Sequence, residues 1–273
     1  MSVCRTAGVL VFASAVLICS GPGGFSLAAQ VRAPRPPEGP RPPAPRLADG
    51  TPNLGRIDPT KGYWAPTQYQ DYTAVLVDLK EMPYQPWARA LADQRKSEAS
   101  KDDPQGFCLP AAGPRLMTTP YPMEIIQLPK RIVMIYEGAG HTFRIIHMDG
   151  RPQPEGDALP PTWKGHSVGR WEGDTLVVDV VGFNEGTWID MAGKPHTDQL
   201  RIVERFTRLD LYTLRYEATL DDPGAYTRPW TIRFDIGWDP NGEIQEYVCQ
   251  ENNRWPETLT GDRGDLVPVP SSR

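Results

Sequence analysis

The chain has 273 residues, which is enough for one domain with a sizeable hydrophobic core. Acidic and basic residues are interspersed and give a net charge of −5, so the chain lacks the basic footprint of a nucleic-acid-binding protein. After residue 18, no apolar run approaches the roughly eighteen residues that a membrane-spanning helix needs.

The beginning of the chain predicts an export signal. Residues 7–18 form an apolar run of about twelve residues, too short to span a bilayer as a helix. Ser26 and Ala28 then occupy the −3 and −1 positions that signal peptidase prefers. We therefore expect removal of residues 1–28 and a periplasmic or secreted bacterial protein. An uncleaved N-terminal membrane anchor is the alternative interpretation.

The next segment, residues 29–60, is rich in proline and has few aliphatic side chains. Such a segment cannot bury enough apolar surface to fold, so it is predicted to be a stiff, disordered leader. We expect a single β-barrel domain over residues 61–265 and a disordered tail over 266–273.

One helix is predicted, over residues 86–100. Pro86 suits the first turn of a helix, and good helix formers follow it. The helix should end before Pro104, because the residue preceding a proline disfavours helical geometry.

From Glu124 onward the pattern changes to short alternating runs separated by turn residues, which is typical of an all-β domain. We expect strands at residues 124–128, 131–137, 142–148, 167–171, 174–181, 199–209, 212–220, 228–238 and 243–249. Short connections favour an antiparallel meander, and nine such strands should close into a barrel. The predicted fold class is thus mainly β with one preceding helix, and a β-sandwich is the alternative.

Cys108 and Cys249 are the two cysteines that remain once the signal peptide is removed. In an oxidising compartment such a pair usually forms a disulfide, which is our prediction. Two free buried thiols are the alternative. Their wide separation argues against a zinc site.

The densest part of the sequence is residues 161–196, PTWKGHSVGRWEGDTLVVDVVGFNEGTWIDMAGKPH. With Tyr226-Thr227-x-Pro229-Trp230 and the segments at 108–110, 120–122 and 248–253, it resembles a large family of exported bacterial proteins with a PTWxGHSxGRWEGDTLVVD signature. The resemblance covers nearly all of the chain after the proline-rich leader. It implies export and a lipocalin-like, or calycin-like, fold, and it brings no reaction with it.

Two histidines are candidate acid–base groups. His166 precedes a strand at the expected barrel rim, and His196 ends a long loop that also holds Trp188 and Asp190. Trp163 and Trp188 would supply an apolar wall for a ligand. The alternative is structural, with the histidines bonded to backbone and the tryptophans in the core.

Carboxylates on apolar strand faces are the second set of candidates. Glu204 shares a face with Ile202 and Phe206, and Asp179 lies on an otherwise aliphatic strand. A buried carboxylate needs a partner or a raised pKa, and Arg144 and Arg170 are possible counter-ions. We predict that both histidines and the carboxylates of 179, 190 and 204 converge on one cavity. A structural salt bridge across the barrel is the alternative.

No cofactor or metal is expected. The sequence has no Gly-rich phosphate loop, no HxH or HxxxH spacing and no acidic calcium loop.

Three functions fit these features. The first is an enzyme that acts on a hydrophobic or aromatic small molecule by cofactor-independent acid–base chemistry, of the lyase, isomerase, hydratase or hydrolase type. The second is a carrier that binds such a molecule without changing it. The third is a surface module whose exposed tryptophans bind glycan or protein. The inward acid and the two histidines favour the enzyme.

Overall fold

A computed structural model describes residues 38–138, 142–251 and 253, and all of them belong to one compact unit of the chain. The predicted signal peptide, residues 29–37 of the predicted leader and residues 254–273 lie outside the described residues.

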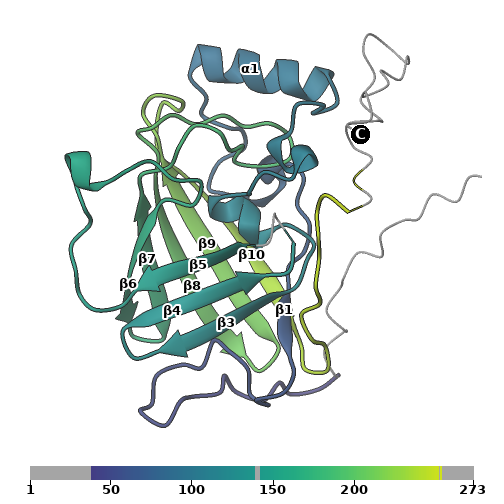
Figure 1. The fold of residues 1–273 in the computed structure, drawn as a ribbon, viewed down its shortest axis with the longest axis vertical. Coiled ribbons are helices and arrows are strands. Elements are labelled where there is room, and N and C mark those ends of the chain that lie inside the picture. Colours follow the sequence, from purple (N-terminus) through teal and green to yellow (C-terminus); the bar gives the residue numbers. More distant parts are fainter. Residues whose placement is uncertain (1–37, 139–141, 252, 254–273) are drawn as a thin grey trace, which may run out of the picture. The chain divides into compact units, whose positions relative to one another are not determined.

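Nine strands close a β-barrel, with β1 pairing with β10 on one side and with β3 on the other (Figure 1). A short further strand, β2 (Leu76–Val77), also pairs with β10. The nine barrel strands are β1 (Tyr63–Ala65), β3 (Met123–Leu128), β4 (Arg131–Tyr136), β5 (Thr142–His147), β6 (His166–Glu172), β7 (Thr175–Val181), β8 (Arg201–Asp210), β9 (Thr213–Asp221) and β10 (Trp230–Asp239). The mainly-β barrel with one α-helix is confirmed, and the sandwich is excluded.

Buried and more exposed residues alternate along the last two strands of the barrel, β9 and β10. On β9 every second residue from Leu214 to Leu220 is fully buried, while the residues between them are partly exposed. On β10 the same pattern runs from Trp230 to Trp238. Successive side chains of a strand point to opposite faces, so one face fills the barrel and the other meets solvent. The barrel interior is therefore a packed core.

The predicted meander is wrong at one place, because β5 and β6 are parallel. Their pairing is short, with Ile146 opposite Ser167 and His147 opposite Val168. Residues 148–165, including the 3-10 helix η4 (Gly156–Ala158), form the connection. Parallel neighbours need such a long crossover, whereas antiparallel ones can be joined by two residues, as at Gly173 and Asp174.

The predicted strand at 243–249 is also wrong, and the structure has no strand there. The free edge of β10 is instead taken by β1, with Trp64 opposite Trp238. Because β1 and β2 pair with β10, the later segment finds no partner there. A strand of only three residues gives no alternation that a sequence pattern could reveal.

The leader prediction fails for its second half. Leu54 is fully buried in the core, its backbone N–H donates to Gln127 Oε1 at 2.6 Å, and its carbonyl accepts from Trp64 Nε1 at 2.7 Å. Arg46 pairs with Asp174 at 2.6 Å at the turn between β6 and β7. Residues from about 41 to 60 therefore cover one end of the barrel rather than forming a disordered leader.

The opposite end is covered by loops and by helix α1 (Pro86–Ser97), with 3-10 helices η1 (Tyr72–Val75), η2 (Pro104–Phe107) and η3 (Gly113–Met117) (Figure 1). Pro86 lies in the first turn of α1, as predicted. The helix ends three residues earlier than predicted because Ala99 and Ser100 adopt left-handed backbone geometry. Within the part of the chain that the structure describes, no helix is long and apolar enough to cross a membrane.

Candidate functional site

The barrel interior holds a buried polar cluster around Glu204. Its carboxylate is fully buried and pairs with both terminal nitrogens of Arg144, which donates from Nη1 to Oε1 at 3.1 Å and from Nη2 to Oε2. Tyr216 donates its hydroxyl to Oε1 at 2.7 Å. Arg144 Nε donates to Ser167 Oγ at 3.0 Å. Of the two possible counter-ions, Arg144 is thus the one that contacts Glu204.

The Arg144–Glu204 pair stabilises the charged form of Arg144 inside the barrel. Burial opposes the charged guanidinium of Arg144, but the attraction of Glu204 outweighs it and raises the pKa of Arg144. Burial and Glu204 together raise the pKa of Tyr216 well above its usual value. The carboxylate therefore has three hydrogen bonds and a permanent counter-ion, which is the arrangement of a structural ion pair.

Asp179 does not join this cluster. It lies on the outer face of β7, where Arg201 donates to its carboxylate from Nε at 2.8 Å and from Nη2 at 2.9 Å. Arg170 is also outside and pairs with Glu172. The prediction of an inward Asp179 is wrong because β7 is apolar on both faces.

Asp190 is fully buried, but in the loop between β7 and β8 rather than in the barrel. It accepts from Lys194 Nζ at 2.7 Å and from the backbone N–H of Tyr72 at 2.9 Å. Lys194 also donates to Asp71 at 2.6 Å. Burial opposes the charge of Lys194, yet Asp190, Tyr84 and Asp71 together outweigh it and raise the pKa of the lysine. This network fastens the loop to η1.

His196 has a structural environment as well. Its Nδ1 donates to the carbonyl of Thr197 at 3.0 Å, so its Nε2 accepts from the hydroxyl of Thr187 at 2.9 Å. Burial lowers the pKa of His196, which keeps the ring neutral. Trp188, in the same loop, is buried under Arg95, whose guanidinium carbon lies 4.4 Å from the ring centroid.

His166 begins β6 on its outer face and stacks on His147, with ring centroids 5.0 Å apart. Its Nδ1 donates to Gln153 Oε1 at 2.9 Å. Burial and the neighbouring His147 lower the pKa of His166. Trp163 lies elsewhere, packed so closely on Gly186 that an added Cβ there would come within 2.9 Å of its ring. The predicted convergence of the two histidines and three carboxylates on one cavity is therefore wrong.

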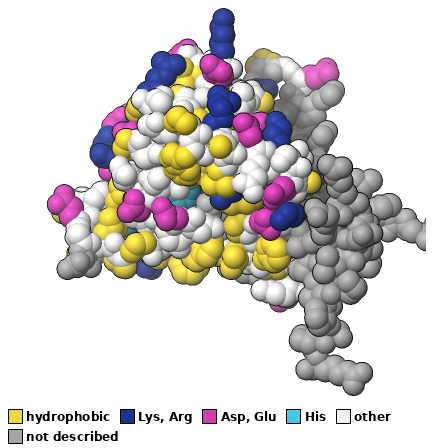
Figure 2. Space-filling view, turned by 90° about the horizontal axis from the view of Figure 1, so that it is seen from above, with side chains coloured by type: hydrophobic (Ala, Val, Ile, Leu, Met, Phe, Trp, Pro, Cys, Tyr) yellow, Lys and Arg dark blue, Asp and Glu magenta, His cyan; other side chains and the backbone are white. Residues whose placement is uncertain are grey.

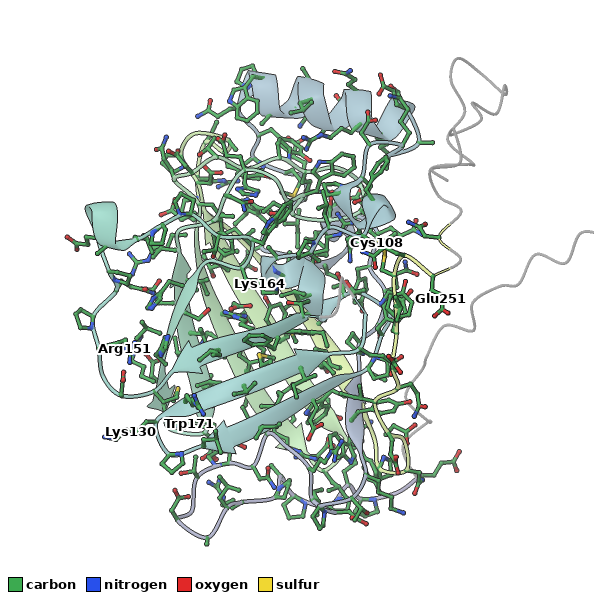
Figure 3. The ribbon with its side chains drawn as sticks, in the orientation of Figure 1. Cys108, Lys130, Arg151, Lys164, Trp171 and Glu251 are labelled. Atoms are coloured by element: carbon green, nitrogen blue, oxygen red, sulfur yellow. A yellow bond between two sulfur atoms is a disulfide. The ribbon has the colours of Figure 1, made fainter. Side chains whose placement is uncertain are left out.

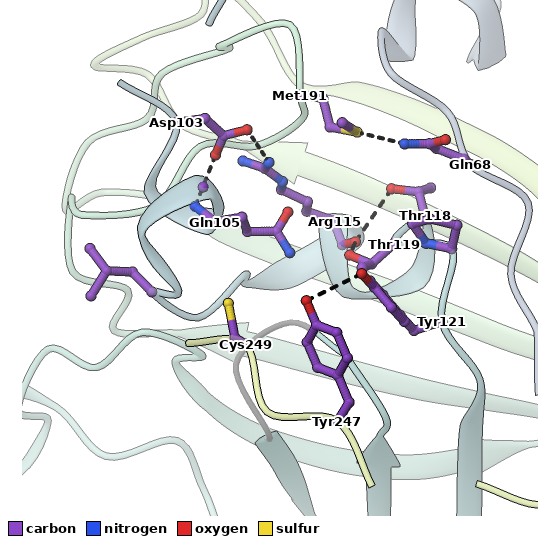
Figure 4. Close-up of a pocket in the computed structure, with 13 residues that line it drawn as sticks. Gln68, Asp103, Gln105, Arg115, Thr118, Thr119, Tyr121, Met191, Tyr247 and Cys249 are labelled. Carbon is purple, nitrogen blue, oxygen red and sulfur yellow. Dashed lines mark hydrogen bonds and ion pairs between the residues drawn. The ribbon is translucent and has the colours of Figure 1, made fainter. Parts of the chain in front are cut away.

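A different cavity lies at the end of the barrel that the helices cover. It has a volume of about 320 Å³, within the usual range for small-molecule sites (Figure 4). Its walls come from η2, η3, the loop before β8 and the segment after β10. The lining residues are Gln68, Asp103, Gln105, Gly106, Leu109, Arg115, Thr118, Thr119, Pro120, Tyr121, Met191, Tyr247 and Cys249. We refer to it as the mouth pocket.

The disulfide between Cys108 and Cys249 holds two walls of the mouth pocket together. This bond confirms the predicted pairing and is consistent with folding in an oxidising compartment. It fastens the segment after β10, which carries Tyr247, to the segment after η2. The Tyr121 and Tyr247 rings lie 4.9 Å apart, and the Tyr121 hydroxyl donates to that of Tyr247 at 3.3 Å.

The polar end of the mouth pocket is the buried pair of Arg115 and Asp103, joined at 2.5 Å. Asp103 also accepts from the backbone N–H of Gln105 at 3.0 Å, so it caps η2. Sequence reasoning missed Arg115 because a 3-10 helix offers no long periodic pattern. The neighbouring segments at 108–110 and 120–122 did carry a signal, since they belong to the resemblance.

Lys164 is a second residue that sequence reasoning missed. It is half-buried just before β6, at the end of the barrel where the loops lie, whereas Lys130 and Trp171 mark the opposite end (Figure 3). Its side chain makes no hydrogen bond or ion pair with the residues that the structure describes. Burial and the nearby guanidinium of Arg144 lower the pKa of Lys164.

Over this end of the barrel, the described side chains in view mix apolar, basic and acidic types without a field of a single sign (Figure 2). Among the described residues, no group of three His, Cys, Asp or Glu side chains is arranged to hold a metal ion. Comparison of the chain with protein-family models, with curated proteins and with solved structures gave no match.

Proposed function

We propose that this protein binds a small molecule with an aromatic body in the mouth pocket and carries it in the cell envelope. The observation that carries the proposal is the pocket itself. Two tyrosines with tilted rings, Tyr121 and Tyr247, form one wall. Leu109 and Met191 add apolar surface, and the buried Arg115–Asp103 pair supplies fixed polar groups. Apolar walls with a few oriented polar groups are typical of small-molecule sites.

The three carboxylates that the sequence suggests for acid–base chemistry all form ion pairs outside the mouth pocket. Glu204 pairs with Arg144, Asp190 with Lys194, and Asp179 with Arg201. None of these three lines the mouth pocket. A general base must lie within hydrogen-bond reach of the proton that it removes, so these carboxylates favour a carrier over an enzyme.

One observation keeps an enzyme as the second candidate. Burial and the nearby guanidinium of Arg144 lower the pKa of the half-buried Lys164, which is the direction of shift that general bases and nucleophilic lysines require. Lys164 lies outside the lining of the mouth pocket, so this chemistry would need a second cavity at the barrel end. Loss of turnover in Lys164→Met with unchanged ligand binding would favour the enzyme.

Native mass spectrometry tests the carrier proposal. The mature protein is purified from its own envelope, and a retained compound is identified by its mass. That compound is then titrated into Tyr121→Ala and into Tyr212→Ala, a matched change at the opposite end of the barrel. We expect at least a tenfold loss of affinity in Tyr121→Ala and little change in Tyr212→Ala. Equal affinity in the two variants would contradict the proposal.

A further inference from the structure

Three arginines of the described chain are almost fully buried, and they differ in how well their donors are satisfied. Arg144 makes three side-chain hydrogen bonds, to Glu204 and Ser167. Arg208 also makes three, to the carbonyls of residues 53, 55 and 211 at 2.7 to 3.0 Å. Arg115 makes one, from Nη2 to Asp103.

A guanidinium has five N–H donors, and a buried donor without an acceptor costs free energy. Nε of Arg208 and Nε of Arg115 both lack an acceptor in the described structure. Arg208 is compensated because its guanidinium stacks on Trp64 and Trp238, at 4.7 and 5.1 Å from their ring centroids. Arg115 has no such ring among the described residues, and of the three it alone lines the mouth pocket.

Arg115 therefore brings a guanidinium with an unsatisfied donor to the wall of the mouth pocket. Resting on the proposed function, we infer that the mouth pocket selects an uncharged aromatic molecule that carries a carbonyl or hydroxyl oxygen, and that Arg115 donates to this oxygen. Tyr121 and Tyr247 then contact the ring.

Charge balance decides between a neutral oxygen and an anion. Arg115 and Asp103 are the two charged residues in the lining, and they already neutralise each other. A carboxylate ligand would place a second negative charge next to Asp103, with no further cation in the lining to match it. A neutral oxygen accepts from the guanidinium without that repulsion.

Three probes that share one ring system test this inference. 2-Acetonaphthone carries a neutral carbonyl, 2-naphthoate carries an anion, and 2-methylnaphthalene carries neither. Dissociation constants are measured by amide chemical-shift titration of the mature protein. We expect the ketone to bind at least tenfold more tightly than either other probe, with the largest shifts at residues lining the mouth pocket.

Arg115→Lys keeps the positive charge for Asp103 and removes the planar fork, so the advantage of the ketone should fall below threefold. Arg233→Lys, on the outer face of β10, is the matched control and should leave the ranking unchanged. The probe ranking on the unchanged chain decides the inference even where Arg115→Lys fails to fold.

Two results would overturn the inference and leave the proposed function standing. These are equal binding of the ketone and the methyl compound in the mouth pocket, or tighter binding of the naphthoate there. Absence of binding by all three probes, or shifts confined to another surface, would count against the proposed function as well.

Discussion

Inside the barrel, the guanidinium of Arg144 on β5 lies against the carboxylate of Glu204 on β8, so each is the counter-ion of the other. Their side chains are almost completely buried. A charge in such a place is tolerated only while its partner is present, since burying an unpaired charge is very costly. The pair therefore ties two distant strands of the barrel together.

Replacing Glu204 with Gln should destabilise the protein without touching the mouth pocket. The change leaves the Arg144 charge unpaired, and breaking a buried ion pair typically costs about 3–5 kcal/mol. Urea unfolding measures the loss. Asp235→Asn, which breaks the exposed pair with Arg215, is the control and should cost less than about 1 kcal/mol. A Glu204→Gln protein of normal stability that has lost turnover would instead make Glu204 catalytic.

The buried His196 should make the protein less stable in mild acid. Burial lowers its pKa in the folded state below the 6.5 of an exposed histidine, although Asp222 and Glu185 partly oppose this shift. The unfolded chain therefore binds a proton first as the pH falls. The stability that comes from neutral His196 is complete above about pH 6.5 and is lost progressively below it.

Melting temperatures of the unchanged protein and His196→Gln between pH 8 and pH 5 measure this effect. The difference between them should shrink as the pH falls, because the variant has no ring to protonate. A constant difference over this range would show that His196 titrates alike in both states.

Removing the disulfide should weaken both the fold and the pocket. Cys108 and Cys249 are 141 residues apart in the sequence, and closing such a loop stabilises by up to about 5 kcal/mol in the chain-entropy model. Its loss also frees the segment that carries Tyr247. Cys108→Ser/Cys249→Ser should thus unfold at lower urea and bind 2-acetonaphthone less tightly under conditions where it remains folded. Unchanged affinity in the folded variant would mean that the disulfide does not shape the pocket.

Leu54→Ala tests the unexpected packing of residues 41–60. Leu54 is fully buried, so shortening it should cost about 2–5 kcal/mol of stability. Ile57→Ala, nearby but about half exposed, should cost much less. Equal, small losses of unfolding free energy in both variants would indicate that this segment is a spacer that does not contribute to the core.

The sequence predicted the barrel where its strands are polar on one face, and failed where they are not. On β9 the charged residues Arg215 and Glu217 alternate with buried ones, so the inward face was clear. On β7 valines occupy both faces, and Val177 is buried although it points outward. Its neighbours in register are Arg170 and Arg205, whose long stems can cover it. The sequence alone therefore does not show that Asp179, on that same face, points outward.

The site could be predicted less well than the fold. Periodicity placed Glu204 on an inward face but left Arg144 and Arg170 both open as its partner. No pattern links the pocket residues Arg115, Tyr121, Met191 and Tyr247, which lie on irregular segments of the chain. Loops that cross a barrel end bring such residues together only in three dimensions. The Cys108–Cys249 disulfide is the one feature of this pocket that the cysteine count predicted, because two cysteines remain after removal of the signal peptide.

A crystal structure of the mature protein with 2-acetonaphthone would show directly whether the mouth pocket is the binding site. We expect the naphthyl ring in the mouth pocket, against Tyr121 and Tyr247, with its carbonyl oxygen within about 3 Å of an Arg115 nitrogen. An empty mouth pocket with the compound bound at another place, such as the groove beside Trp238 at the opposite end of the barrel, would contradict it.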